Sequence, residues 1–315
     1  MKKKIIFSTR PFRDEFIQKI YQIAPDYEFR TTATSDDFSQ IEISIGWQSD
    51  IQDRLLATDS LRWVQALSAG VDYLPLDSFS QQKILLTNGS GIHAQSITQH
   101  VLGTVIAYYR GLFQSLQNQQ QKLWAQDEIF YQEYSEKTML IVGTGQIGKE
   151  LAQTVRALGI HTIGINTTGH FVEGFDATFS LEELPSTLEK ADIVVNILPL
   201  TQATHHLFNL QLFSHFKSDA LFINVGRGAS VNTADLMTAL SKNYFAFAAL
   251  DVLEEEPLPQ EHPLWDFDNV LITPHIAGLT PGFQQKFMAI FLPNLEAFVN
   301  DQEFPINHVD LSSGY

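Results

Sequence analysis

Three short segments contain side chains that can bind an anion and move a proton. Arg227 lies in a Gly-Arg-Gly turn directly after the apolar run 220–225. His275 follows another apolar run, with Pro274 before it and Gly278 three residues after it. A guanidinium is permanently charged and can hold a carboxylate, whereas an imidazole can donate a proton near neutral pH. These residue types therefore favour acid catalysis on an anionic substrate.

A carboxylate that could assist the histidine ends the acidic run Glu254–Glu256. An acid beside His275 would stabilise the imidazolium and keep it loaded as a proton donor. Reduction of a 2-oxo acid needs such a donor, a cation for the carboxylate and the carbonyl, and a source of hydride. Each residue alone also has a structural explanation: Arg227 could pair with another carboxylate, the acids could be solvated, and His275 could be a structural histidine.

A glycine-rich loop provides a candidate site for a hydride-carrying dinucleotide. Gly143-Thr-Gly145-Gln-Ile-Gly148 follows a strand predicted at 138–142 and opens a helix predicted at 147–158. The first glycine permits the tight turn, the second lets the backbone approach a pyrophosphate, and the third lets the helix pack closely on the strand. The diphosphate would lie at the positive end of the helix. A glycine turn that binds nothing is the alternative.

The position expected to contact the adenosine ribose is not acidic. It holds Asn166, followed by Thr167, Thr168, Gly169 and His170. Asparagine lacks the carboxylate that would repel a 2′-phosphate, and threonine hydroxyls can hydrogen-bond to a phosphate. The arginine that often accompanies a 2′-phosphate is missing, and His170 is a weak substitute for it. The balance slightly favours NADP(H) over NAD(H).

The elements that must position these residues alternate between short apolar strands and helices. From residue 138 onward, strands are predicted at 138–142, 161–165, 193–198, 220–225, 246–250 and 270–272. Short apolar strands separated by helices indicate a doubly wound parallel sheet with both faces covered. Such sheets bind ligands beyond the carboxyl ends of their strands, where the glycine loop, Asn166 and Arg227 would lie.

The first ninety or so residues have the same alternation on a smaller scale. Strands are predicted at 4–7, 42–47, 61–67 and 83–88, with a helix at 13–23. One long helix is predicted from Ala94 to Trp124, and a last one at 281–299 that returns to the first domain. We therefore expect two α/β domains with doubly wound parallel sheets: a substrate domain of residues 1–98 and 285–315, and a dinucleotide-binding domain of residues 99–284.

Composition excludes several classes of partner and site. The 315 residues include 36 acidic and 20 basic ones, and the net charge of −16 argues against nucleic acid or an anionic membrane as partner. The lack of cysteine excludes disulfides, thiolate metal sites and cysteine nucleophiles. No metal site is expected, because His93, His205 and His206 lack further ligands at suitable spacing. No apolar run has the length of a membrane span, and we expect a cytoplasmic protein.

The order of these motifs over nearly the whole chain resembles that of the D-isomer-specific 2-hydroxyacid dehydrogenases. The matching segments are the glycine loop, Asn224-Val-Gly-Arg-Gly228, Leu250-Asp-Val-Leu-Glu-Glu-Glu-Pro-Leu-Pro259, Pro263-Leu-Trp265 and Thr273-Pro-His-Ile-Ala-Gly278. The resemblance implies a flavodoxin-like substrate domain, an NAD(P)-binding domain, and NAD(P)H-dependent reduction of a small 2-oxo acid to a D-2-hydroxy acid. Glu-Pro-Leu-Pro and Pro-Leu-Trp are similar to the glyoxylate and hydroxypyruvate reductase branch.

The resemblance also implies roles for single residues. Arg227 would orient and polarise the substrate, His275 would donate the proton, and Glu256 would pair with it, whereas Glu254 and Glu255 lie outside the matching position. The backbone N–H groups of Ser68, Ala69, Gly70 and Val71 would hold the substrate carboxylate together with Arg227, although that segment alone could be an ordinary turn. The expected cofactor contacts are Gly143, Gly145, Gln146, Ile147, Gly148, Asn166, Thr167, Leu198, Pro199, Thr204, Val225 and Asp251.

Two departures and two rival functions accompany the resemblance. Asn166 replaces the acid of NAD-preferring members, and Gln99 replaces a glutamate that many members have at the start of the long helix. The family implies a homodimer through helix 94–124, with Trp124 reaching the neighbour's site. A nucleotide-sensing, corepressor-like binding protein on the same fold is the main alternative. Oxidation of formate or phosphite is a further one.

Overall fold

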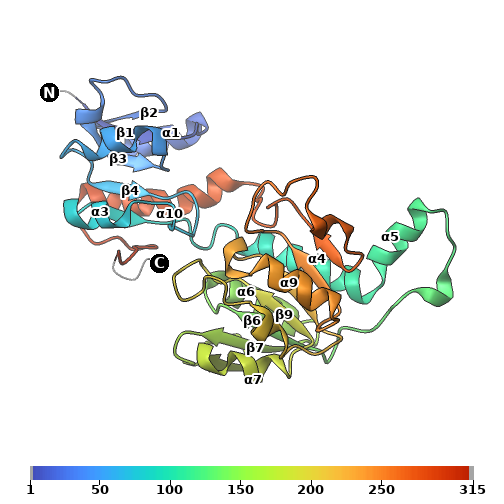
Figure 1. Cartoon of the computed structure of the whole chain (residues 1–315). Helices are drawn as coiled ribbons and strands as arrows, with labels where there is room; N and C mark the ends of the chain where they lie inside the picture. Colours follow the sequence, from blue (N-terminus) through green and yellow to red (C-terminus); the bar gives the residue numbers. More distant parts are fainter. Residues whose placement is uncertain (1–2, 312–315) are drawn as a thin grey trace. The chain divides into compact units, whose positions relative to one another are not determined.

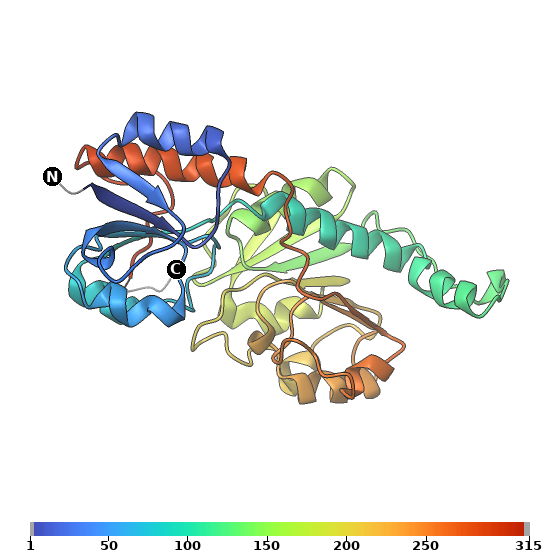
Figure 2. The same cartoon turned by 90° about the horizontal axis from the view of Figure 1, so that it is seen from above.

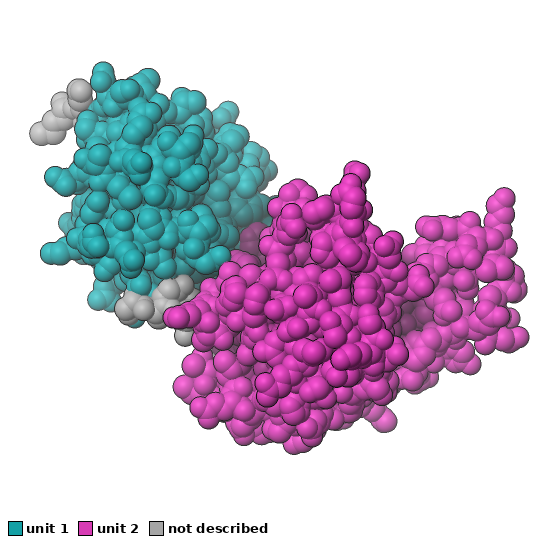
Figure 3. All heavy atoms as spheres, in the orientation of Figure 1, with its two compact units in different colours: residues 1–92, 280–315 teal, residues 93–279 magenta. Residues whose placement is uncertain are grey.

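The computed structural model describes residues 3–311 of the chain. Two compact units make up the structure (Figure 3): the first runs to Ile92 and resumes at Thr280, and the second comprises His93–Leu279. Each unit is built on one fully parallel sheet, which confirms the expected pair of α/β domains. The units divide a few residues before the boundaries expected from the sequence. Their assignment to substrate and to dinucleotide stays a prediction.

The first unit contains a five-stranded sheet in the order β2-β1-β3-β4-β5. Its strands are β1 (Lys4–Ser8), β2 (Tyr27–Arg30), β3 (Ile41–Ile45), β4 (Trp63–Gln65) and β5 (Leu85–Thr87). This is the flavodoxin-like order, in which the direction of winding reverses between β1 and β3. The sequence predicted all of these strands except β2, which is only partly apolar.

Helices cover both faces of this sheet, as Figure 2 shows. Helices α1 (Asp14–Ile23) and α10 (Phe283–Val299) lie side by side on one face, whereas α2 (Gln52–Leu56) and α3 (Leu76–Gln82) cover the other. Successive residues of a strand point to opposite faces, so Ile6 packs against α1 and α10 while Ile5 packs on the side of α2 and α3. Both faces are buried, which explains the continuous apolar runs in the sequence.

The second unit contains a seven-stranded sheet in the order β12-β11-β10-β9-β6-β7-β8 (Figure 1). Its strands are β6 (Thr138–Val142), β7 (His161–Asn166), β8 (Ala177–Ser180), β9 (Ile193–Asn196), β10 (Leu221–Asn224), β11 (Phe247–Leu250) and β12 (Val270–Ile272). The winding reverses between β6 and β9, so this is the Rossmann arrangement with one additional strand. Ligands bind such sheets at the point of reversal, directly beside the glycine loop.

The faces of the second sheet are covered by two sets of helices. Helices α4 (Ala94–Tyr109) and α6 (Gln146–Arg156) pack on one face, and α7 (Leu184–Leu188), α8 (Leu210–Phe213) and α9 (Thr233–Ser241) on the other. Met139 and Leu140 illustrate the alternation, since each joins a different hydrophobic cluster. The central strands are therefore buried on both sides, and their carboxyl ends stay available for ligands.

The long helix expected from Ala94 to Trp124 is interrupted. Helix α4 ends at Tyr109, and α5 (Leu112–Gln120) begins after Gly111, whose φ is +65°. A Cβ at Gly111 would lie 2.3 Å from Ile129 Cγ2, so both the turn and the close approach require glycine. Figures 1 and 2 show α5 extending away from the sheet of its unit. The prediction of one continuous helix was therefore wrong.

Candidate active site

His275 and Glu256 form a hydrogen-bonded pair beyond the ends of β11 and β12. His275 Nδ1 lies 2.7 Å from Glu256 Oε2, and Glu256 Oε1 accepts a hydrogen bond of 3.0 Å from the backbone N–H of Leu253. The side chains are 56% and 37% exposed, respectively. With Nδ1 donating to the carboxylate, Nε2 is the nitrogen left to act on a substrate. The exposure of the imidazole allows it to regain a proton from solvent.

The backbone at His275 adopts a conformation that is unusual for a residue with a side chain. Its φ is +54°, in the left-handed region that non-glycine residues rarely occupy. Its N–H donates to the carbonyls of Asp251 and Thr273, both at 2.9 Å, and these bonds hold the turn in place. Strained backbone of this kind is commonly found where a side chain must be aimed for function.

Asp251 fixes the turn that carries His275. Its carboxylate is almost completely buried, and Oδ1 accepts from Thr273 Oγ1 at 2.5 Å and from the N–H of Ile276 at 2.9 Å. Oδ2 accepts from the N–H of Ala277 at 2.9 Å. A buried carboxylate satisfied by three donors is a rigid anchor. From the sequence, Asp251 was predicted only as a cofactor contact, and that contact stays a prediction.

Arg227 follows β10, and its backbone carbonyl is held by a buried polar network that the sequence did not predict. Asn196 Nδ2 donates to Asn224 Oδ1 at 3.0 Å and to Ser230 Oγ at 2.7 Å. Ser230 Oγ in turn donates to the carbonyl of Arg227 at 2.6 Å. The three polar side chains are fully buried, and buried groups with satisfied hydrogen bonds hold one geometry. Polar residues ending two neighbouring apolar strands were the available signal.

The turn that carries Arg227 packs directly on the loop that carries Glu256. A Cβ built on Gly228 would lie only 1.9 Å from the carbonyl oxygen of Leu253 and 2.7 Å from the nitrogen of Glu254. The backbones of the two segments are therefore in contact, and only glycine permits it. The structure thus joins the segments of Arg227, Glu256 and His275, which are far apart in the sequence.

The glycine loop has the shape that a diphosphate requires. Gly143 adopts φ +115°, and a Cβ on Gly148 would lie 2.1 Å from the carbonyl oxygen of Gly143. A Cβ on Gly145, by contrast, would meet none of the described atoms within 4 Å. Gly145 is also the N-cap of α6, so its backbone faces open space at the positive end of a helix. The loop therefore fits a dinucleotide diphosphate. Gln146 is exposed beside it, and Ile147 packs against the core.

The side chain of Asn166 is engaged in its own loop at the end of β7. Its Oδ1 accepts from the N–H groups of Thr168 at 3.2 Å and of Gly169 at 2.7 Å, and its Nδ2 donates to the carbonyl of His170 at 2.9 Å. Asparagine commonly builds turns in this way. Thr167, Thr168 and His170 are exposed around this loop. Asn166 shapes the loop, and its exposed neighbours are the groups available to a ligand.

The remaining expected cofactor positions lie in a turn and in the core of the second unit. Thr204 is buried, and its hydroxyl donates to the carbonyl of Pro199 at 2.7 Å, which closes the turn after β9. Val225 is buried in a hydrophobic cluster, and Leu198 packs on the other cluster. These contacts hold the ends of the strands together. Contact with a cofactor stays a prediction for all four.

The expected substrate loop of the first unit, Ser68–Val71, comes shortly after β4. The carbonyl of Ser68 accepts from the N–H of Gly89 at 2.8 Å, and that of Ala69 accepts from Asn88 Nδ2 at 2.9 Å. Ser68 Oγ donates to the carbonyl of Gly70 at 2.8 Å. The loop is therefore ordered through hydrogen bonds to its carbonyl groups, and binding of a substrate by its N–H groups stays a prediction.

Among residues 3–311, no three His, Asp or Glu side chains are grouped closely enough to hold a metal ion. Within the same range, no helix combines the length and the apolar character needed to cross a lipid bilayer.

The chain is similar to known proteins of one family. The family model described as D-isomer specific 2-hydroxyacid dehydrogenase, NAD binding domain, matches residues 102–277. Glyoxylate/hydroxypyruvate reductase A from Yersinia enterocolitica is 32% identical over 287 residues, covering 89% of each chain. The match to the family model covers more than half of the chain, and the relative covers most of it.

Solved structures resemble the chain over nearly its whole length. Phosphoglycerate dehydrogenase from Lactobacillus plantarum is 40% identical, with a TM-score of 0.60, and the match covers 98% of this chain and 100% of that one. A D-isomer specific 2-hydroxyacid dehydrogenase from Xanthobacter autotrophicus, in complex with NADPH and MES, is 28% identical, with a TM-score of 0.85 and full coverage of both chains. The chain therefore belongs to the D-isomer-specific 2-hydroxyacid dehydrogenase family, in its glyoxylate/hydroxypyruvate reductase-like branch, and is an NAD(P)-dependent oxidoreductase.

Proposed function

We propose that this protein reduces a small 2-oxo acid to the D-2-hydroxy acid, with His275 as the proton donor. The observation that carries the proposal is the pair of His275 and Glu256 at 2.7 Å, fixed by buried Asp251 and open to solvent. A donor held in one orientation, with one nitrogen occupied and the other available, suits protonation of an alkoxide that develops during reduction.

Each of the three residues Arg227, His275 and Glu256 has a separate role in the proposed reaction. Arg227 attracts the negative charge of the substrate and polarises its carbonyl. The bound nicotinamide would supply hydride to the carbonyl carbon. His275 Nε2 gives its proton to the carbonyl oxygen, so that the product carries a hydroxyl and the imidazole becomes neutral. Glu256 stabilises the imidazolium before the transfer, and solvent returns the proton afterwards.

The loop Ser68–Val71 is proposed to hold the carboxylate of the substrate through its N–H groups. The support is that its carbonyls of Ser68, Ala69 and Gly70 already accept hydrogen bonds within the first unit. Successive backbone N–H groups in a turn form a concave site for an anion.

NADPH is proposed as the slightly preferred cofactor. The loop after β7 has no carboxylate where a 2′-phosphate would lie, and its exposed hydroxyls at Thr167 and Thr168 can donate to one. The relative from Xanthobacter autotrophicus binds NADPH, which agrees with this choice. The preference is modest, because the loop also offers no arginine to the phosphate.

Glyoxylate and hydroxypyruvate are the first substrates to test, because the relative from Yersinia enterocolitica is named for them. A second candidate is oxidation of a phosphoglycerate, favoured by the 40% identity to phosphoglycerate dehydrogenase from Lactobacillus plantarum. The two candidates share the Arg, Glu and His machinery and differ in the groups that must accommodate a phosphate.

The test is to follow NADPH and NADH consumption with glyoxylate, hydroxypyruvate, pyruvate, phenylpyruvate and branched 2-oxo acids. Oxidation of phosphoglycerate is measured in parallel. We expect turnover with at least one small 2-oxo acid and a higher kcat/KM with NADPH than with NADH. Nucleotide binding without turnover of any 2-oxo acid would contradict the proposed reaction. Turnover of phosphoglycerate alone would favour the second candidate.

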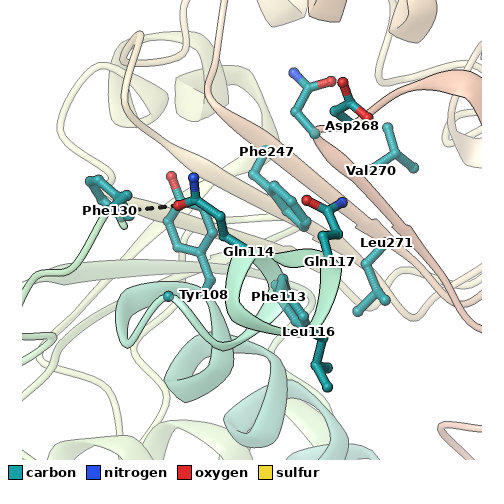
Figure 4. A pocket seen from close by; sticks show the side chains of 12 residues that line it. Tyr108, Phe113, Gln114, Leu116, Gln117, Phe130, Phe247, Asp268, Val270 and Leu271 are labelled. Atoms are coloured by element: carbon teal, nitrogen blue, oxygen red, sulfur yellow. Dashed lines mark hydrogen bonds between the residues drawn. The ribbon is translucent and has the colours of Figure 1, made fainter. Parts of the chain in front are cut away.

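A homodimer built through α4 and α5 is also proposed. The support is an apolar hollow of about 500 Å³ in the second unit, lined by residues such as Tyr108, Phe113, Leu116 and Phe247 (Figure 4). Beyond α5, the side chain of Trp124 is 95% exposed. Large apolar groups gathered beside a projecting helix are typical of a surface that a second chain covers.

A further inference from the structure

Glu254 ties the loop that carries Glu256 to two other segments of the second unit. Its Oε1 lies 2.5 Å from His206 Nε2, and its Oε2 accepts a hydrogen bond of 2.6 Å from the backbone N–H of Thr233. Burial alone would raise the pKa of the Glu254 carboxyl, but the hydrogen bonds from Thr233 and His206 outweigh burial and hold that pKa below its usual value. Glu254 is therefore an ionised anchor with a partner on each oxygen.

One partner of Glu254 follows the turn of Arg227 in the chain, and the other is hydrogen-bonded to that turn. Thr233 is the first residue of α9, whose positive end favours a carboxylate. The backbone N–H of His206 donates to the carbonyl of Ala229 at 2.9 Å, one residue after Gly228. The hydrogen bonds of Glu254 therefore add to the direct contact between Gly228 and the backbone of Leu253–Glu254.

The loop that carries Glu254 also fixes the position of the Glu256 carboxylate, which lies beside the imidazole of His275. The N–H of Leu253 donates to Glu256 Oε1 at 3.0 Å, and Glu256 Oε2 lies 2.7 Å from His275 Nδ1. A shift of the loop would therefore move Glu256 relative to both His275 and the turn of Arg227. Misplacement of catalytic groups by as little as about 1 Å can cost roughly a hundredfold in rate.

We propose that Glu254 is a positioning residue: it fixes the loop that carries Glu256 at the correct distance from Arg227 and His275. It does so through its hydrogen bonds to His206 and Thr233. The inference rests on the proposed function, in which Arg227, Glu256 and His275 carry the chemistry. Glu255, the neighbour of Glu254 in the chain, is exposed and provides a matched control, because it belongs to the same acidic run.

The kinetic test compares Glu254→Ala, Glu254→Gln and Glu255→Ala in the full-length protein, with NADPH and the best 2-oxo acid. We expect Glu254→Ala to lower kcat about 10- to 100-fold while the KM for NADPH stays unchanged. Glu254→Gln should recover most of the rate, since an amide can accept from Thr233 and donate to a neutral His206. Glu255→Ala should equal the wild type.

A measurement that does not need turnover is hydrogen exchange of the peptide that contains Leu253. We expect the N–H of Leu253 to exchange faster in Glu254→Ala, because the loop opens more often, and to be unchanged in Glu255→Ala. Replacing His206 with alanine should speed exchange to an intermediate degree, because the bond from Thr233 remains.

Wild-type rate and unchanged Leu253 exchange in Glu254→Ala would overturn the inference. It would also be overturned if Glu254→Ala lost NADPH affinity and thermal stability together with kcat and Glu254→Gln did not recover, since Glu254 would then be merely structural. Failure of the proposed function would look different: the wild type itself would turn over no 2-oxo acid, and hydrogen exchange would still decide the role of Glu254 in the loop.

Discussion

Two glycines with equally open surroundings provide a test of the cofactor site. A Cβ on Gly145, in the glycine loop, or on Gly103, within α4, would meet none of the described atoms within 4 Å. Alanine at either position is therefore compatible with the folded chain. Only at Gly145 would the added methyl group occupy the path of the diphosphate.

We predict that Gly145→Ala raises the Kd for NADPH by about tenfold or more, equivalent to about 1.4 kcal/mol of binding free energy. Gly103→Ala should leave the Kd unchanged, and removal of a glycine from a helix should stabilise the chain by about 0.5–1 kcal/mol. Titration calorimetry and thermal unfolding measure the two effects. Equal NADPH affinity for both variants would place the diphosphate elsewhere.

Part of the candidate site could be predicted from single residues and part could not. Arg227, Glu256 and His275 stand in short motifs, so their types and order are visible in the sequence. The hydrogen bonds from Asn196 to Ser230 and from Thr233 to Glu254 join residues that are 34 and 21 positions apart. Polar residues at the ends of apolar strands mark the region, but no local pattern tells which residues will pair, because the partners meet only after the strands have formed a sheet.

Glu42 connects the beginnings of four strands of the first unit through its hydrogen bonds and ion pairs. It lies buried in β3 and forms ion pairs with Lys4 of β1 at 3.0 Å and with Arg62, just before β4, at 3.2 Å. Tyr27, at the start of β2, donates a hydrogen bond to it. Burial would raise the pKa of Glu42, but the hydrogen bonds from Tyr27, Lys4 and Arg62 outweigh burial and lower it.

A carboxyl whose pKa is lowered by folding stabilises the chain above its unfolded pKa, and that contribution is lost as the pH falls through the folded pKa. We therefore predict that Glu42→Gln lowers the free energy of unfolding by about 1–3 kcal/mol near neutral pH. The difference from the wild type should shrink below about pH 4. Urea unfolding at several pH values measures this. Glu15→Gln, which removes an exposed ion pair with Arg13, is the control and should leave the free energy of unfolding nearly unchanged.

Most elements could be predicted because their strands are buried on both faces. Runs such as Met139–Val142 and Ile193–Val195 are continuously apolar, and this pattern predicts central parallel strands. Strand β8, at the edge of its sheet, is only half-buried, and it was missed. The break at Gly111 was also missed, since a single glycine within an apolar periodic pattern is compatible with a continuous helix.

In the second unit, helix α5 projects from the sheet and exposes the apolar side chain of Leu116 (Figure 1). We predict a dimer in sedimentation velocity at micromolar concentration. Leu116→Lys should produce a folded monomer, because it would place an unpaired charge in the apolar interface. Leu158→Lys replaces an exposed leucine elsewhere in the second unit and should leave the dimer intact. A wild-type monomer would rule out the proposed dimer.

In the proposed reaction, His275, oriented by Glu256, delivers the proton during reduction of a 2-oxo acid. This role is tested by measuring kcat for the best 2-oxo acid in His275→Gln, with NADPH affinity determined on the same protein. We predict a loss of roughly 100- to 10,000-fold in kcat with unchanged affinity for NADPH, and a smaller loss in Glu256→Gln. A rate for His275→Gln close to that of the wild type would rule out His275 as the proton donor.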